Sequence, residues 1–391
     1  MKSKLVSTDV MHEELSRLVE LKKRNSFGDP ILRFVTRDAI GKSLLRPKFK
    51  NRQRLFYVSS DPSVPSRTLA AVVARVSPTI QDEDGKPVGM LGFFDAIDEL
   101  DPAEQVLCAA DEWLRENGCE SIVGPIDGDT WHKYRFNVGP DSDPPFLLEP
   151  TNPNYYSQLF TKSGLEVVDR YHSLRVDDIN SILPTLKPAF DSAMDSGFRF
   201  RPIRLDHFSA ELKTIFEIST AAFRENFLFD DVSWEEFFGI YAEAKSLVRS
   251  ELVWFVEDSD GSEIGFLFCL PDYYSAVASM KGKSNVFARF RFLWNRSSAD
   301  AVNFKSIAVL PEHRRSNLAG ALMYHGYRES LKLGFTKANL CLIRDGNPSS
   351  RLDGGNSRIL RRYELYQTPD SRLTGAPIFP GLEEAESTAD G

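Results

Sequence analysis

Cysteine is scarce in this sequence, and the few cysteines are spread widely along it. The four are Cys108, Cys119, Cys269 and Cys341, with no Cys-x-x-Cys pair and no histidine at ligand spacing. A zinc site or a disulfide framework needs cysteines that are clustered or paired. The sequence therefore predicts reduced, buried thiols and no metal site.

Long apolar runs and an excess of positive charge are also missing. No run approaches the ~18 apolar residues that span a bilayer, and no apolar secretion signal begins the chain. The formal net charge is -8, so the field of the whole protein does not attract nucleic acid. We expect a cytoplasmic protein that does not bind nucleic acid. Its 391 residues suffice for two domains, each with its own core.

Residues 1–56 differ from the rest in charge, with 14 Lys/Arg against 6 Asp/Glu. Met11, Leu15, Leu18 and Val19 recur at helical spacing, and basic residues fill the expected last turn. Two interpretations stay open: a basic arm that touches an acidic membrane surface or partner, or a peripheral helix that packs on the domain behind it.

Two similar series of elements follow. Residues 57–178 form a first domain and residues 179–202 a connector, and residues 203–380 form a second domain before an acidic tail at 381–391, which we expect to be disordered. In the first domain the pattern predicts strands at 69–76 and 88–94, a helix at 102–117, a strand at 121–123, a helix at 155–162 and a strand at 166–176. In the second it predicts helices at 209–224 and 234–247, strands at 251–257, 263–270 and 304–309, a helix at 319–333, a strand at 337–343 and a last helix at 357–367. The fold class is α/β with mixed sheets.

The segment Val309–Leu322 carries the clearest chemical signal. An apolar strand ends at Pro311-Glu312, and a basic loop then opens directly into an amphipathic helix. This arrangement directs several backbone N–H groups and a helix N-terminus at one spot, beside Arg314 and Arg315. It is suited to holding an anion such as a diphosphate.

These residues resemble the acetyl-CoA-binding loop of the GNAT superfamily of N-acetyltransferases, which has the form Arg/Gln-x-x-Gly-x-Gly/Ala. Arg314, Asn317 and Ala319 occupy the three defined positions. Asn317 replaces the usual glycine, and asparagine is the next most tolerant residue of left-handed backbone. The resemblance implies two tandem GNAT-like domains, each a mixed, mostly antiparallel sheet flanked by helices. It also implies acetyl-CoA or a longer acyl-CoA as co-substrate, held by Ile307, Ala308, Val309, Arg314, Arg315, Ser316, Asn317, Leu318, Ala319, Gly320, Asn356 and Tyr363.

The same resemblance suggests catalytic residues. Tyr363 falls where the family keeps a tyrosine that protonates the departing thiolate of CoA, and the alternative is a core residue of an amphipathic helix. The general base is not identified by the sequence. Asp272 and Asp345 each follow a strand end and are candidates, although both can equally be loop carboxylates.

The first domain resembles a copy of the fold that has lost CoA binding. Asp95, Asp98, Glu99 and Asp101 replace the basic loop and would repel a diphosphate. The layout is similar to bacterial tandem GNAT-like proteins, including some linked to N-acylation of long-chain sphingoid bases. A long acyl chain is therefore possible, and the Phe-rich stretch Phe287–Trp294 either borders an acyl tunnel or packs in a core.

Three functions follow from these patterns. The first is acyl transfer from CoA to a small-molecule or lipid amine, including a long-chain, ceramide-synthase-like form. The second is a non-catalytic acyl-CoA-binding or scaffold protein on the same fold. The third is aminoacyl transfer from a charged tRNA, which the acidic net charge disfavours.

Overall fold

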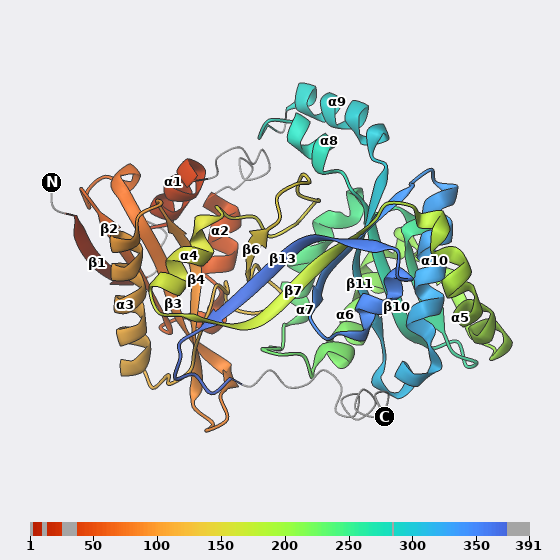
Figure 1. The fold of residues 1–391 in the computed structure, drawn as a ribbon, viewed down its shortest axis with the longest axis horizontal. Helices are drawn as coiled ribbons and strands as arrows, with labels where there is room; N and C mark the ends of the chain where they lie inside the picture. Colours follow the sequence, from red (N-terminus) through yellow and green to blue (C-terminus); the bar gives the residue numbers. More distant parts are fainter. Residues whose placement is uncertain (1–2, 10–13, 26–36, 284, 374–391) are drawn as a thin grey trace, which may run out of the picture.

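In the computed structural model the described residues, 3–9, 14–25, 37–283 and 285–373, form one continuous thirteen-stranded sheet with helices on both faces (Figure 1). The strand order is β1-β2-β3-β4-β5-β13-β7-β12-β11-β10-β9-β8, and β6 also pairs with β13. Most neighbours are antiparallel, and the parallel pairs are β4 with β5 and β11 with β12. The mixed, mostly antiparallel α/β fold predicted from the sequence is confirmed.

The two halves repeat one order of elements: strand, two helices, three strands, helix, strand. The first half contains β1 (Lys4–Asp9), α1 (Leu15–Asn25), α2 (Arg37–Leu44), β2 (Gln53–Ser59), β3 (Thr68–Gln81), β4 (Pro87–Ala96), α3 (Leu100–Glu116), β5 (Ile122–Gly124), β6 (Phe136–Gly139), α4 (Tyr155–Lys162) and β7 (Glu166–Val176). The second half contains α5 (Leu183–Asp195), β8 (Arg199–Pro202), α6 (Phe208–Phe223), α7 (Trp234–Tyr241), β9 (Val253–Glu257), β10 (Glu263–Pro271), α8 (Tyr274–Ser279), α9 (Val286–Asn295), β11 (Ala301–Val309), α10 (Leu318–Lys332), β12 (Lys337–Arg344) and β13 (Ser357–Gln367).

The segment 1–56, expected to be an arm, belongs to the first copy of this order. Strand β1 pairs with β2 along its whole length, and Leu15, Leu18 and Leu21 of α1 are buried in a core with β3. The basic residues of α1 also have partners, because Arg24 donates to the carbonyl of Ser66 and Lys22 lies 3.8 Å from Asp95. The repeat therefore begins at β1. The expected acidic tail lies outside the described residues.

The two halves exchange their last strands. Strand β7 of the first half pairs with β12 of the second, and β13 of the second half pairs with β5 and β6 of the first. The two exchanged strands lie side by side at the centre of the sheet, as Figure 1 shows in yellow-green and blue. Each half thus depends on the other for a strand, and the sheet has no break between the halves.

The prediction of a last helix at 357–367 is wrong, because this segment is strand β13. Its side chains alternate from Arg361 to Leu365, with Arg361, Tyr363 and Leu365 buried and Arg362 exposed between them. That two-residue period is typical of a strand with one covered face. The sequence alone does not show this alternation, because one of the buried positions is occupied by a charged residue, Arg361.

The Phe-rich stretch, expected either to border an acyl tunnel or to pack in a core, forms α9, part of an insertion at 272–300 between β10 and β11. Strands joined in a hairpin usually need only ~2–5 connecting residues. Val286, Phe287 and Trp294 of α9 are 79%, 79% and 73% exposed, so core packing is wrong for this face. Among the described residues, no helix combines the length and the apolar character that crossing a membrane requires.

His325 gives the second half a measurable dependence on pH. It is only 6% exposed and stacks on Trp254 of β9 with ring centroids 4.4 Å apart. Burial first, and the charge of Arg328 second, lower the pKa of His325 to about 4. The unfolded chain, with a histidine pKa of ~6.5, binds the proton first, so folding stability falls as pH drops from ~6.5 to about 4.

We expect this histidine to cost about 3 kcal/mol of unfolding free energy over that interval. The measurement is urea unfolding of the wild type and of His325→Gln between pH 4 and 7. In the wild type the free energy of unfolding should be lower at pH 4 than at pH 7, and in the variant most of this difference should disappear. Parallel curves for the two proteins would contradict a histidine that is neutral when folded.

Candidate functional site

The candidate site begins where two parallel strands separate. Strands β11 and β12 pair only from Ala301 with Lys337 to Phe304 with Leu340. Beyond that point β11 stays on β10 while β12 stays on β7. Leu342 in β12 has a positive φ of 61° next to a shift of register, which turns the strand away. Residues 305–309 and 341–344 therefore border a gap that widens toward the ends of both strands.

Backbone amides of β11 point into this gap. The amide of Leu310 donates to the carbonyl of Ile264 on the β10 side at 2.8 Å. Successive amides of a strand point to opposite sides, so those of Ile307 and Val309 face the gap and that of Ala308 faces β10. An amide that stabilises an oxyanion formed in the gap must point into it. Val309 has this orientation, whereas Ala308 and Leu310 do not.

The basic loop follows the gap directly. Pro311–Ser316 forms one 3-10 segment, and Asn317 then adopts φ 53° and ψ 24°, the left-handed conformation, before α10 begins at Leu318. An asparagine tolerates this conformation better than most residues, which explains how it can replace glycine here. Arg315, Ser316 and Asn317 are exposed.

The N-terminus of α10 carries no side-chain cap. Its first intrahelical bond runs from the amide of Ala321 to the carbonyl of Asn317, so the amides of Leu318, Ala319 and Gly320 have no partner within the helix. A β-carbon at Gly320 would lie 3.0 Å from Ala189 and from Asn317, so the small residue lets the turn close. Arg314 is held away from the helix by Glu225, at 3.1 Å, and by the carbonyl of Ala222. Arg315 is the basic side chain that remains exposed at the loop.

A buried polar group marks the apex of the gap. Asn303 of β11 and Asn339 of β12 lie just before the strands separate, and the amide of Asn339 donates to Asn303 at 2.7 Å. The same amide lies 3.4 Å from Asp272, the residue that follows β10. Asp272 accepts from the backbone N–H of Leu147 at 2.9 Å and, more distantly, of Tyr274. Burial raises the pKa of Asp272, although these hydrogen bonds oppose the shift.

Asp272 also lines a cavity of about 240 Å³. The cavity lies between the base of the 272–300 insertion, the beginnings of β11 and β12, and the loop at Asp143–Pro145 of the first half. Of its other charged residues, Asp143 pairs with Arg358 and Asp300 with Lys337, while Arg175 also lines the cavity and its charge acts to lower the pKa of Asp272. Asp272, by contrast, is held by amides. The cavity thus lies at the paired starts of β11 and β12, and its lining residue Asp272 contacts the apex through Asn339.

Tyr363 and Asn356 are placed differently from the prediction. Tyr363 is fully buried in β13, and its hydroxyl donates to Glu149 at 2.5 Å and lies 3.1 Å from Ser173. Burial raises the pKa of Tyr363, and the charge of Glu149 adds to the effect. Asn356 is exposed and directly precedes β13. The next residue, Ser357, pairs with Val176 at the end of β7, so Asn356 lies near that end of the strand. The structure does not bring Asn356 to the loop.

Asp345 follows β12 at the wide end of the gap, where it forms a pair that sequence reasoning missed. Its carboxylate lies 2.6 Å from Nδ1 of His172 on β7. His172 is 173 positions away in the chain, and no local pattern connects the two residues. Only the exchange of β7 into the second half brings them together.

The corresponding gap of the first half is closed by its own chain. Strands β4 and β5 pair only at Gly89 with Ile122 and at Met90 with Val123. The next residues bridge the two strands, because the backbone N–H of Ile126 donates to the carbonyl of Leu91 and that of Phe93 to the carboxylate of Asp127 at 2.6 Å. A small cavity lined by Phe93 and Asp127 remains beside them. Asp95, one of the acidic residues expected to repel a diphosphate, is buried against Tyr156 and Asn25.

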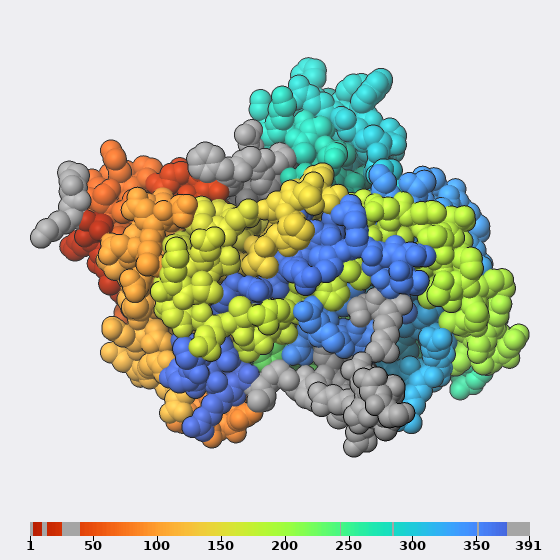
Figure 2. All heavy atoms as spheres, in the orientation of Figure 1, coloured from red at the N-terminus to blue at the C-terminus, as the bar shows by residue number. Residues whose placement is uncertain are grey.

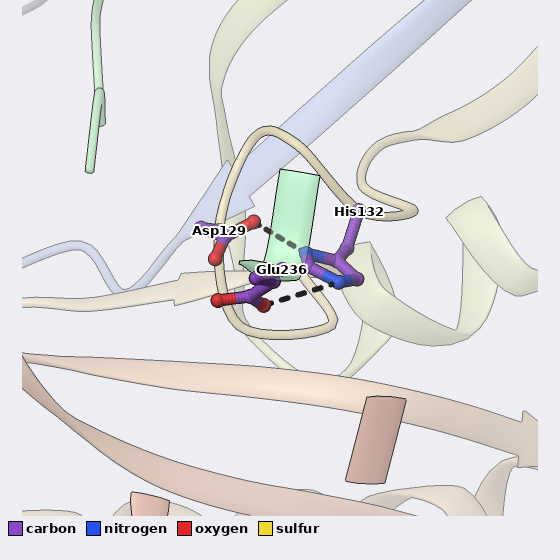
Figure 3. A group of neighbouring side chains, drawn as sticks. All are labelled: Asp129, His132 and Glu236. Carbon is purple, nitrogen blue, oxygen red and sulfur yellow. Dashed lines mark hydrogen bonds and ion pairs between the residues drawn. The ribbon is translucent and has the colours of Figure 1, made fainter. Parts of the chain in front are cut away.

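A group of possible metal ligands lies elsewhere, between the halves. Asp129, His132 and Glu236 converge in Figure 3, with His132 2.6 Å from Asp129 and 3.6 Å from Glu236. Arg46 contacts both carboxylates at 2.5 Å, and Lys48 contacts Asp129 at 2.8 Å. Burial acts to raise the pKa of Asp129, but His132, Lys48 and Arg46 outweigh it and hold the pKa well below its ordinary value. Two cations already neutralise the group, which fits an ion-pair network joining the halves better than a metal site.

Comparison with known proteins agrees with this geometry. The chain is similar to a GCN5-related glucosamine N-acetyltransferase region of a fungal multi-domain β-N-acetylglucosaminidase, with a TM-score of 0.53 and 16% identity. The match covers 94% of this chain and 38% of that larger one, so the chain spans little more than a third of it. A GCN5-related N-acetyltransferase from Anabaena variabilis matches with a TM-score of 0.50 and 10% identity over 93% of this chain and 72% of that one. The fold is therefore that of the GCN5-related N-acetyltransferases (GNAT).

A curated relative is more similar in sequence. The bacterial ceramide synthase of Caulobacter vibrioides is 24% identical over 366 residues, which are 90% of this chain and 94% of that protein. No protein-family model matches the sequence. The two proteins are thus similar over nearly their whole lengths, at a level of identity that leaves the individual site residues to be argued from the structure.

Proposed function

We propose that this protein is an N-acyltransferase that moves an acyl group from CoA to an amine. The observation that carries the proposal is the uncapped N-terminus of α10, which directly follows the gap between β11 and β12. Unpartnered amides at a helix N-terminus favour an anion, and the partial positive charge of the helix adds to the attraction. The GNAT fold of the solved structures supports the same interpretation.

In this proposal the amides of Leu318, Ala319 and Gly320 bind the diphosphate of CoA, with Arg315 beside them. The pantetheine arm then enters the gap, where the amides of Ile307 and Val309 face it. The thioester carbonyl lies toward the apex, and an amide of β11 stabilises the negative charge that develops on its oxygen.

The acceptor amine approaches from the other side, through the cavity lined by Asp272. Its nitrogen attacks the thioester carbon, the amine proton passes to Asp272, and the C–S bond breaks, so that CoA leaves as a thiolate that takes a proton from solvent. A carboxylate with a raised pKa is a better base than an ordinary one, because its proton affinity is closer to that of the group it deprotonates. Tyr363 has its hydroxyl bonded to Glu149, so we assign it a positioning role in place of the expected protonation of the thiolate.

The resemblance to bacterial ceramide synthase supports a lipid amine as acceptor and a long acyl chain as donor group. A non-catalytic acyl-CoA-binding protein remains the second candidate, favoured by the first half, whose gap is closed.

The test introduces a charge at the proposed diphosphate site. Ala319→Asp places a carboxylate in the first turn of α10, where it favours the helix but repels a diphosphate. We expect the variant to fold normally and to bind CoA at least about tenfold more weakly than wild type, as measured by calorimetry. Ala319→Asn is the neutral control of matched size and should bind within a few-fold of wild type.

A second measurement separates the two candidate functions. Release of free thiol from acetyl-CoA and palmitoyl-CoA, with and without a long-chain amine, reports transfer directly. Amine-dependent release supports the enzyme, whereas CoA binding without release supports the binding protein. Equal CoA affinities of the Asp and Asn variants would contradict the site itself.

A further inference from the structure

The insertion between β10 and β11 presents an apolar face that nothing in the described chain covers. Val286, Phe287, Phe290, Leu293 and Trp294 of α9 are between 53% and 79% exposed. Their spacing, i, i+1, i+4, i+7 and i+8, places all five on one side of the helix. The opposite side rests on the protein, since Ala288 is 2% exposed and Phe292 contacts Tyr273 with ring centroids 5.7 Å apart. Figures 1 and 2 show α8 and α9 standing out from the body of the molecule.

The charge around this face has one sign. From Tyr273 to Ala299 the chain has no Asp or Glu and five basic residues, in a protein whose formal net charge is -8. The five are exposed and flank the apolar face: Lys281, Lys283, Arg289, Arg291 and Arg296. An apolar face of Phe, Leu and Trp with basic residues beside it is typical of helices that lie in the interface of an acidic membrane.

We infer that α9 docks this protein on a lipid surface that carries negative headgroups. The apolar side chains enter the boundary between headgroups and acyl chains, and the flanking Lys and Arg side chains contact lipid phosphates. A second copy of this chain fits the face less well, because a symmetric contact would bring the two sets of basic residues together. The inference places membrane contact at 272–300 and not at the N-terminal segment, whose helix is built into the first half. It does not depend on acyl transfer.

The experiment uses the full chain and sedimentation with vesicles. Vesicles of phosphatidylcholine with phosphatidylglycerol should bind the wild type, and vesicles of phosphatidylcholine alone should bind it far more weakly. The triple variant F287S/F290S/W294S should lose at least about tenfold in affinity for the acidic vesicles. R289Q/R291Q should weaken binding to the acidic vesicles only. Met194→Ser, an exposed apolar residue on α5 that is 49% exposed, is the control and should bind as wild type does.

Three results would overturn the inference. They are an absence of binding to acidic vesicles, binding that the triple variant leaves unchanged, and a dimer in solution that the triple variant converts to monomer. Thermal unfolding of each variant checks that the fold is kept, which the exposure of the replaced residues leads us to expect. Thiol release in detergent-free buffer with a soluble amine is a separate readout. It should stay near wild type in the triple variant, so failure of docking and failure of acyl transfer can be told apart.

Discussion

Replacing Asp272 with asparagine is expected to lower the turnover number of acyl transfer by about 10²–10⁴-fold, the usual contribution of a positioned base. The asparagine keeps an oxygen that can accept from the amides of Leu147 and Tyr274, which hold Asp272 in place. The fold and the cavity should therefore be preserved. The Michaelis constant for acyl-CoA should change little, because the diphosphate site lies at the other end of β11.

The dependence of the rate on pH gives a sharper result. The base must be ionised to accept a proton, so the wild-type turnover number should fall as pH drops through the pKa of Asp272. Burial raises that pKa above the ordinary value for aspartate, so the fall begins at a higher pH than an exposed aspartate would give. The residual rate of Asp272→Asn should lack this fall.

Asp300→Asn is the matched control, since Asp300 lines the same cavity but pairs with Lys337 at 2.7 Å. Its rate and pH profile should stay near wild type. An Asp272→Asn protein that turns over at close to the wild-type rate would rule out Asp272 as the base. Asp345, which pairs with His172 at the wide end of the gap, would then be the next residue to replace.

Replacing Glu149 with alanine is expected to destabilise the protein by about 3–5 kcal/mol, the cost of removing one partner of a buried ion pair. Arg361 is 1% exposed, and its Nε donates to Glu149 at 2.9 Å. The same carboxylate accepts from the hydroxyl of Tyr363 and from the amide of Phe146. Without it, a buried cation and two donors lose an acceptor together.

Chemical denaturation measures the free energy of unfolding that Glu149→Ala loses. Two further variants provide the comparison. Tyr363→Phe removes the hydrogen bonds of the hydroxyl with Glu149 and Ser173 but leaves the ion pair, so it should cost less, about 1–3 kcal/mol, and should keep acyl transfer within a few-fold of wild type. Asp370→Ala breaks an exposed pair with Arg115 and should change stability little. A large loss of turnover in Tyr363→Phe, with unchanged CoA binding, would instead return Tyr363 to the role of proton donor.

Much of the fold could be predicted because its signals are local. Strand β7 and helix α4 have the predicted bounds to the residue, since a turn ending at Gly164 separates two clear periodicities. The loop at 311–317 was equally readable, because a strand, a Pro-Glu turn, two arginines and a helix follow each other without interruption. The left-handed conformation of Asn317 agrees with the reason given for its tolerance there.

The rest depended on contacts between distant residues. The sequence predicts a helix for β13 because the partners that let Arg361 be buried are far away in the chain: Glu149, 212 positions before it, and the carbonyls of Pro140 and Asp143. The exposed face of α9 has the sequence of a core helix, and only the structure shows that no described element covers it. Asp272 gains its importance from Asn339 and from the cavity, neither of which its own sequence neighbours reveal.

The shared centre of the sheet has a consequence for biosynthesis. A ribosome releases residues 1–176 well before it makes residues 357–367, yet the edges of β5 and β6 stay open until β13 arrives. Open strand edges invite pairing with other chains. The first half therefore stays incomplete until β13 is available, and its productive folding is coupled to the synthesis of residues 357–367.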